Sequence, residues 1–306
     1  MVEANEPLAD ASTSIGSASP ARPAALGPER WRSDVDRLKG TTFDIVVVGG
    51  GIVGAGVALD AVTRGLSVGV VEAQDWASGT SSRSSKLVHG GLRYLQMRDF
   101  ALVREALRER SILLRTAPHL VQPIRFLYPL RHRIWERAYV GAGIALYDLL
   151  ARTQGQRPSL PRHRQLSRRR THELVPALKG ESFVGAVSYY DAQVDDARHT
   201  MSVMRTAASA GAAVVNRVKA IGLAEESSRV TGVRVRAVES GEEFTISAKV
   251  VISATGVWTE EFEGLAGRGR AMRLEPSKGV HLVLPRRCID SDAALILQTE
   301  KSVLFV

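Results

Sequence analysis

The chain has 306 residues, of which 44% are hydrophobic, so it can bury a core without disulfides or structural metals. Its single cysteine, Cys288, excludes an internal disulfide and is compatible with a reducing cytoplasm. The net charge of +9 favours an anionic partner, such as an acidic membrane surface or an anionic substrate, and the absence of a nucleic-acid-binding motif argues against nucleic acid.

The N-terminal segment, residues 1–40, is rich in Ala, Ser, Pro and Gly and is predicted to be a disordered tail rather than a secretory signal. A short helix over Pro28–Leu38 is compatible with a proline in the first turn. The uncharged run that follows, residues 45–59, has 15 residues. A membrane-spanning helix needs about 20, so none is predicted here.

A dinucleotide-binding motif begins at residue 43. The run FDIVVV predicts a buried parallel strand, and Gly49, Gly51 and Gly54 follow it in G-x-G-x-x-G spacing before a predicted helix. A second strand, residues 66–71, ends at Glu72. The glycines would let a pyrophosphate approach the helix N-terminus, and Glu72 would accept hydrogen bonds from the ribose hydroxyls. The motif alone does not distinguish NAD from FAD, although the acid disfavours NADP.

The segment GTSSRSSKLVHGGLRYL, residues 79–95, is cationic and rich in hydroxyl groups, and it contains no carboxylate. Its composition indicates an anion-binding loop. Residues 99–117 then predict a packing helix with Asp99 as its N-cap.

Residues 152–172 hold seven arginines and no acid. A solvated surface segment and a contact with anionic lipid headgroups are both compatible with this composition. RNA binding is the weakest alternative, because no aromatic residues are interleaved for stacking.

The second half of the chain favours FAD. A strand over 184–190, a helix from Asp195 or Asp196, a strand over 213–218 and a β-meander over 229–252 lead to Ala254-Thr255-Gly256. This order is expected of the second part of a large FAD-binding domain, whereas a nicotinamide dehydrogenase would continue with strand–helix units. Small residues after the last strand would let the backbone lie against the dinucleotide.

The sequence resembles the FAD-dependent glycerol-3-phosphate dehydrogenases, in particular the actinobacterial, quinone-linked form. The resemblance covers about residues 41–306 and rests on VVVGGGIVGAGVALDAVTRGLSVGVVEAQD, GTSSRSSKLVHGGLRYL, YYDAQVDDAR, SATGVW, SKGVHLVLP and LQTEKSVLFV. It implies an α/β fold: a Rossmann-like FAD-binding domain of the glycine-oxidase/D-amino-acid-oxidase type, with an antiparallel-sheet substrate domain.

The resemblance also implies an activity. Members of the family oxidise sn-glycerol 3-phosphate to dihydroxyacetone phosphate and pass the electrons to membrane quinone, while bound peripherally to the inner face of the cell membrane. Self-association into a homo-oligomer is compatible with the sequence. Because the family continues beyond the equivalent of Val306, the chain is expected to be a C-terminally shortened form with an incomplete substrate domain.

The predicted domain limits follow this scheme. They are a tail (1–40), the first part of the FAD-binding domain (41–120), an insertion with the arginine-rich segment on the substrate-domain side (121–183), the second part of the FAD-binding domain with the β-meander (184–265), and the start of the substrate domain (266–306).

The predicted site residues divide by role, and no metal site is predicted. Arg93 and His281 are the predicted catalytic residues, with His281 as general base in a KGVHLVLP strand. Arg93, Tyr94 and Lys278 are predicted to contact the substrate. The predicted cofactor contacts are Gly49, Gly51, Gly54, Glu72, Thr80, Ser81, Ser82, Ser84, Ser85, Lys86, Leu87, His89, Gly90, Gly91, Val218, Ala254, Thr255 and Gly256.

Two alternatives remain open at this point. One keeps the fold but changes the chemistry to a glycerol-3-phosphate oxidase or an amino-acid or 2-hydroxy-acid oxidase. The other is a non-catalytic FAD-binding fragment.

Overall fold

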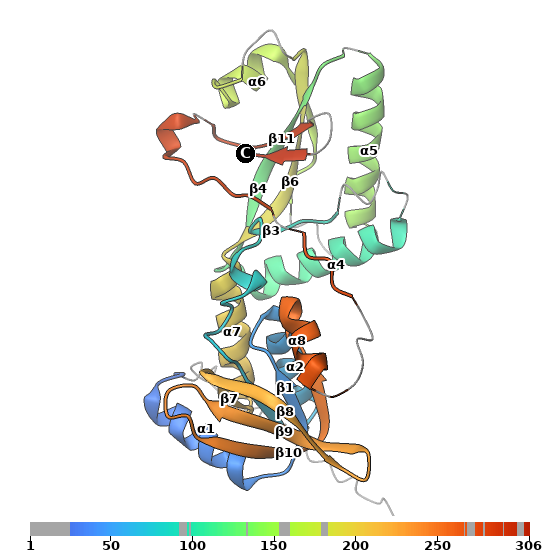
Figure 1. The fold of residues 1–306 in the computed structure, drawn as a ribbon. Coiled ribbons are helices and arrows are strands. Elements are labelled where there is room, and N and C mark those ends of the chain that lie inside the picture. The colour runs from blue at the N-terminus through green and yellow to red at the C-terminus, as the bar shows by residue number, and fades with distance from the viewer. Residues whose placement is uncertain are drawn as a thin grey trace, which may run out of the picture.

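The structure is a computed structural model. It describes residues 25–91, 97, 99–132, 134–152, 160–178, 183–265, 267, 273–277, 279–289, 291–298 and 303–306. Two sheets organise the molecule: one lies in the lower part of Figure 1 and the other in the upper part, with helix α4 (Phe100–Thr116) crossing between them.

The lower sheet has six strands in the order β7-β2-β1-β10-β9-β8. Strands β7, β2, β1 and β10 are parallel neighbours, and β10, β9 and β8 form an antiparallel meander. The strands are β1 (Phe43–Val48), β2 (Val68–Val71), β7 (Ala213–Val215), β8 (Val218–Glu226), β9 (Arg229–Ala237) and β10 (Glu243–Ser253). The predicted strand–helix–strand unit and the meander are therefore confirmed. The single strand predicted over 213–218 is divided, because Arg217 has a φ of 58° and breaks the extended backbone.

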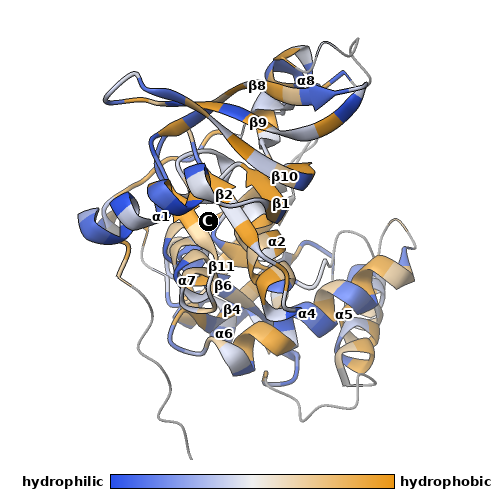
Figure 2. Cartoon of the chain, turned by 90° about the horizontal axis from the view of Figure 1, so that it is seen from below, coloured by the Kyte–Doolittle hydropathy of each residue, from blue (hydrophilic) through white to orange (hydrophobic). Residues whose placement is uncertain are grey.

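Helices α2 (Ile52–Thr63) and α7 (Asp196–Ser209) cover one face of this sheet. Val47 points to that side and packs with Ala55, Ala58 and Met204, because alternate residues of a strand face opposite sides of the sheet. The small alanines let α2 lie close to the strands. In Figure 2 the strands β1 and β10 are largely orange, whereas α1 (Pro28–Gly40) on the periphery is largely blue.

Helix α1 covers the other face of the sheet, so residues 28–40 do not belong to a disordered tail, and the short helix expected over Pro28–Leu38 is present. Residues 1–24 of the predicted tail lie outside the described residues. Val35 and Leu38 pack against the strands. Asp34, which is completely buried, accepts hydrogen bonds from Arg30 (2.7 Å) and Arg37 (2.9 Å). Its carboxylate also accepts the edge-strand N–H of Val214 at 3.1 Å, which joins α1 to the sheet.

Replacing Asp34 with alanine is expected to lower the free energy of unfolding by about 3 kcal/mol, since it leaves the buried Val214 N–H without its acceptor and removes the carboxylate that pairs with Arg30 and Arg37. Urea titration of both proteins measures the difference. Asp36→Ala is the matched control, because Asp36 is exposed on the same helix. Equal losses in the two variants would contradict the structural role of Asp34.

The upper sheet runs in the order β12-β11-β4-β6-β3, and β5 also pairs with β6. Its strands are β3 (Leu87–Val88), β4 (Val121–Leu130), β5 (Arg164–Ser167), β6 (Gly185–Val194), β11 (Ala294–Gln298) and β12 (Val303–Phe305). Helices α4 and α5 (Trp135–Arg152) bury residues such as Leu107 and Ile144 against it. The remaining helices are α6 (Arg168–Leu174) and α8 (Thr259–Leu265), together with the 3₁₀ turns η1 (Thr80–Ser82), η3 (Gly256–Trp258) and η4 (Arg286–Cys288).

Strand β6 departs from the predicted domain limits, which placed residues 184–265 with the FAD-binding domain. It pairs along its whole length with β4, from Gly185 opposite Leu130 to Val194 opposite Val121. After β6, the chain returns to the lower part with α7. The segment KGVHLVLP also differs from expectation: its described residues 279–285 form no strand, and Val280, Leu282 and Val283 are 79%, 81% and 96% exposed.

Candidate functional site

The glycine turn between β1 and α2 has the close packing that its spacing predicts. Gly49 has a φ of 116°, and a Cβ at that position would lie 2.4 Å from the Ala254 carbonyl oxygen. A Cβ on Gly54 would lie 1.9 Å from the Gly49 carbonyl oxygen. These two positions therefore require glycine for packing. Gly51 is the N-cap of α2 with an ordinary φ of −79°, and a Cβ there would lie 3.1 Å from the Ser81 hydroxyl.

Glu72 lies at the end of β2, directly beside this turn. One carboxylate oxygen accepts the N–H of Gly50 at 2.6 Å and the other accepts the N–H of Gln74 at 2.7 Å. Val218, another predicted contact, donates its N–H to the Glu72 carbonyl at 2.9 Å. Glu72 thus braces the glycine turn, and each carboxylate oxygen keeps a lone pair with which to accept a ribose hydroxyl.

The hydroxyl-rich segment begins at the N-terminus of α2. Ser81 in η1 accepts the N–H of Ile52 at 2.9 Å, so a side chain about thirty residues away supplies a cap that Gly51 lacks. Gly79, the residue before η1, packs closely against η3, since a Cβ on Gly79 would lie 2.9 Å from the Trp258 ring. Thr80 and Ser82 belong to the same turn, and the Ser82 hydroxyl donates to the Gly79 carbonyl at 3.3 Å.

The middle of the segment is held by Asp196, the first residue of α7. Its carboxylate accepts a short hydrogen bond from the Ser84 hydroxyl and lies 3.0 Å from the Lys86 ammonium. Burial alone would raise the pKa of Asp196, but the hydrogen bonds from Ser84 and Lys86 outweigh it and hold the pKa below its ordinary value. Lys86, predicted to contact the cofactor, is therefore already paired, and Ser85 beside it is exposed.

Because the pKa of Asp196 is lower in the folded chain than in the unfolded one, the stability it confers is present above about pH 4 and is lost as pH falls through the folded value. Lys86→Met should lower stability by no more than about 1 kcal/mol near neutrality, since the ammonium is more than half exposed. The difference from the unmodified chain should shrink below pH 4 in urea titrations. Arg83→Met, a change at a neighbouring exposed cation, is the control. A pH-independent difference would count against the Lys86–Asp196 pair.

The described part of the segment ends in a turn that follows β3. Leu87 is half-buried in the strand, Gly90 is buried, and Gly91 has a φ of 75°. The exposed His89 accepts the Gly91 N–H through Nδ1 at 3.2 Å, which makes a compact turn over His89–Gly91.

The closing turn Ala254-Thr255-Gly256 meets the glycine turn. Ala254 donates its N–H to the Val48 carbonyl at 2.8 Å, and Gly256 has a φ of 57°. The Thr255 hydroxyl is 3.1 Å from the Ser253 hydroxyl. Two small-residue backbone turns therefore lie side by side at the N-terminus of α2, whose first turn carries no acid.

Of the predicted substrate-binding and catalytic residues, the structure describes His281. Arg93, Tyr94 and Lys278 lie outside the described residues. His281 is exposed in the non-regular segment 279–285, so the strand that was predicted to direct it is absent there.

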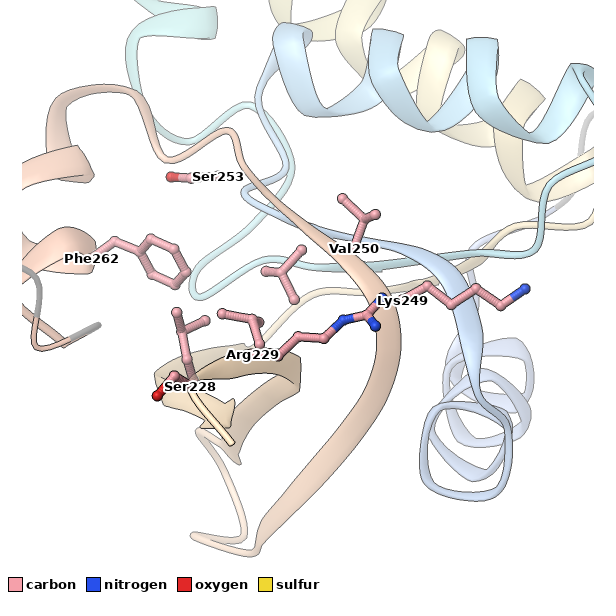
Figure 3. Close-up of a pocket in the computed structure, with 9 residues that line it drawn as sticks. Ser228, Arg229, Lys249, Val250, Ser253 and Phe262 are labelled. Carbon is pink, nitrogen blue, oxygen red and sulfur yellow. The ribbon is translucent and has the colours of Figure 1, made fainter. Parts of the chain in front are cut away.

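A cavity of about 490 Å³ lies elsewhere, between the meander and α8. Figure 3 shows Arg229 and Phe262 at this cavity, with the Lys249 ammonium extending to one side, where it pairs with Asp44 at 2.7 Å. The cavity is on the opposite side of β10 from β1 and does not include the glycine turn. It is a groove of the sheet, separate from the glycine turn. No cluster of metal-ligating side chains occurs among the described residues.

Sequence reasoning assigned no contact with the predicted segment to Asp191, Asp196, Tyr147 or Trp258, although Asp196 was a candidate for the start of a helix. The motif YYDAQVDDAR contains two of them and was the available signal.

The arrangement suits FAD. The glycine turn admits a pyrophosphate next to helix N–H groups, a carboxylate stands at the end of β2, and the hydroxyl-rich segment continues from the same point.

Comparison with known proteins supports this assignment. A family model described as DAO, FAD dependent oxidoreductase, matches residues 44–304. Glycerol-3-phosphate dehydrogenase from Mycobacterium leprae is 52% identical over 284 residues, which are 92% of this chain and 48% of that protein. The mitochondrial glycerol-3-phosphate dehydrogenase of Homo sapiens is 43% identical over 79% of this chain and 34% of its own length.

Among solved structures, glycerol-3-phosphate dehydrogenase from Bacillus halodurans, complexed with FAD, has a TM-score of 0.57 and 31% identity. The match covers 75% of this chain and 37% of that one. The chain thus spans about half, or less, of the length of the relatives it matches. With a family model that covers most of the sequence, the chain belongs to the family of FAD-dependent oxidoreductases.

Proposed function

We propose that the chain binds FAD and oxidises sn-glycerol 3-phosphate to dihydroxyacetone phosphate. The observation that carries the proposal is the meeting of the Gly49 and Ala254 turns at the N-terminus of α2, in a sequence 52% identical to a protein named glycerol-3-phosphate dehydrogenase. Bound FAD would supply the acceptor for the hydride that leaves carbon 2 of the substrate.

The protein residues supply position, charge and a base. Arg93, with Tyr94 and Lys278, is proposed to hold the substrate phosphate, because a guanidinium fork matches its oxygens. His281 is proposed to take the proton of the carbon-2 hydroxyl. An unchanged pH–rate profile in His281→Ala would remove it as the base.

The direct test is anaerobic. The purified chain, loaded with FAD, is mixed with glycerol 3-phosphate, and the visible absorbance of oxidised flavin is expected to bleach. Bleaching followed by release of peroxide in air would favour an oxidase, whereas reoxidation by a soluble quinone without peroxide supports a quinone-linked dehydrogenase. A chain that binds FAD but does not bleach would be an FAD-binding unit without this activity. That outcome is a real alternative because the chain matches only 48% of its relative.

We further propose that the chain docks on the inner, anionic face of the cell membrane. Among the described residues no helix has both the length and the apolar character to cross a bilayer. Helix α5 instead exposes an apolar stripe, with Trp135, Tyr139 and Leu149 63%, 65% and 57% exposed. Figure 2 shows orange positions along this helix at one side of the molecule. Arg137 of α5 donates to the Leu166 carbonyl of β5 at 3.4 Å, and β5 and α6 carry exposed arginines. Exposed aromatic residues and exposed cations both favour an anionic lipid surface.

Replacing both Trp135 and Tyr139 with serine is expected to weaken binding to vesicles with anionic lipid by roughly tenfold, because the variant buries less apolar area in the headgroup region. Co-sedimentation with anionic and neutral vesicles measures the effect. Leu66→Ser with Val238→Ser changes two exposed apolar residues of the lower part and is the control. Equal binding to neutral vesicles, or the same loss in both variants, would contradict this surface.

A further inference from the structure

A buried ion pair lies behind the segment proposed to contact the flavin. Asp191 of β6 is 2% exposed, and Arg110 of α4 is 3% exposed. The Arg110 guanidinium makes a short hydrogen bond to Asp191 and a 3.1 Å bond to the hydroxyl of Tyr147 from α5. That hydroxyl lies 3.2 Å from both carboxylate oxygens of Asp191. Three elements of the upper part thus converge on one carboxylate.

Stability does not explain this pair. Removing a carboxylate and a guanidinium from water costs as much as their attraction returns, so apolar residues of similar volume would serve the core equally well. Desolvation raises the pKa of Asp191, and Arg110 opposes the rise. The Arg110 Nε–H has no hydrogen-bond partner within the described part of the chain. The buried pair therefore holds the Asp191 carboxylate in a fixed position, although it does not give the most stable packing of the core.

The carboxylate also binds a backbone group of the proposed flavin segment. Asp191 accepts the N–H of Gly90 at 3.1 Å, across 101 residues of sequence. The Gly90 backbone lies close against Tyr147 and Leu107, since a Cβ there would be 2.3 Å from both the Tyr147 hydroxyl and Leu107 Cδ2. On the other side of Gly90, His89 is exposed.

The hydroxyl-rich segment is therefore bound at two points, one by α7 and one by β6. Asp196 binds Ser84 and Lys86 near its beginning, and β3 pairs with β6 in between. At its end, the Gly90 N–H donates to the Asp191 carboxylate of β6.

We propose that Asp191 is a positioning residue, which fixes the His89–Gly91 turn against the flavin through the Gly90 N–H, with Arg110 and Tyr147 fixing its carboxylate. The proposal rests on the proposed FAD binding and adds a specific support for that site. The same hydrogen bond sets the point from which the chain continues to Arg93, two residues beyond Gly91.

Two substitutions separate positioning from charge balance. Asp191→Asn keeps an oxygen for the Gly90 N–H but leaves Arg110 without a counter-charge. Asp191→Ala removes both. A residue that only neutralises Arg110 would give two equally affected variants, whereas a positioning residue should be rescued in part by asparagine.

Amide hydrogen exchange over residues 87–91 of the cofactor-free 306-residue chain is the first measurement, and the dissociation constant for FAD is the second. We expect the alanine variant to exchange roughly tenfold faster in this segment and to bind FAD roughly tenfold more weakly, with the asparagine variant nearer to the unmodified chain. Asp34→Asn is the matched control, because Asp34 is also buried, paired with arginines and bound to a backbone N–H. It should lose stability without changing either measurement.

The outcomes are distinct. Equal effects of asparagine and alanine, or the same effects in Asp34→Asn, would overturn the positioning role while FAD binding stands. An unmodified chain that binds no FAD would overturn the proposed function and this extension together. If neither Asp191 variant folds, Tyr147→Phe, which leaves both charges in place, should show the same effects in smaller degree, and its full equivalence to the unmodified chain would overturn the proposal.

Discussion

Valine in place of Gly51 is expected to abolish flavin binding, with a loss of affinity of at least roughly a hundredfold, while the chain still folds. The φ of −79° at Gly51 is accessible to any residue, so the backbone is not strained. A Cβ there would lie 3.1 Å from the Ser81 hydroxyl, directly over the Ile52 N–H. The side chain would occupy the place where a phosphate must approach the helix N-terminus. The ratio of flavin absorbance to protein, with the circular dichroism of the variant, measures both expectations.

A matched control is available on the same helix. A Cβ at Gly56 meets no heavy atom within 4 Å, so Gly56→Val should bind FAD normally. Gly54→Ala should instead impair folding itself, because its Cβ would lie 1.9 Å from a carbonyl oxygen. A yellow Gly51→Val protein would refute the assignment of this turn to the cofactor phosphates.

Replacing Arg93 with alanine is expected to raise KM for glycerol 3-phosphate by roughly 10- to 100-fold, the loss associated with a charge-assisted hydrogen bond to phosphate. Oxidation of glycerol, which has no phosphate, should change little. The ratio of kcat/KM for the two substrates, measured for the holoenzyme by flavin reduction, reports the effect on the phosphate alone.

Arg83→Ala is the control for that experiment, since it removes an exposed arginine from the same cationic segment. A loss of kcat/KM that is equal for glycerol and glycerol 3-phosphate would show that Arg93 does not select the phosphate. The same selectivity change in Arg83→Ala would assign the effect to general charge.

The parts of the fold that local sequence specifies were predictable. The β-branched run before Gly49 and the glycine spacing after it gave the correct strand, turn and helix, because a close backbone approach requires glycine at defined positions. The helix N-caps were also predictable, because an aspartate just before a helix can accept a backbone N–H of its first turn. Asp99 accepts the N–H of Leu102 at 3.0 Å, and Asp195 accepts that of Arg198 at 3.1 Å.

Contacts between distant residues were not predictable. The absence of carboxylates from residues 79–95 suggested that Lys86 was reserved for an anionic ligand, whereas Asp196 binds it from 110 residues away. Alternation in KGVHLVLP predicted a strand, but a strand needs a neighbour with free backbone groups, and residues 279–285 have no strand partner within the described part of the fold. The alternation of apolar residues shows that a segment can form a strand, but it does not show which strand the segment would pair with.

The contacts between residues 84–90 and 191–196 have a consequence for the order of folding. They close loops of 101 to 112 residues, whereas β1, α2 and β2 pair within a short stretch of chain. Loop closure costs more entropy as loops lengthen, and contacts between distant segments tend to form late. We therefore expect the glycine turn to form early and the hydroxyl-rich segment to become ordered only after β6 and α7 are in place. During synthesis, a nascent chain would gain high affinity for the cofactor only once Gly256 has left the ribosome, because the turn that meets the glycine turn is made after β6 and α7.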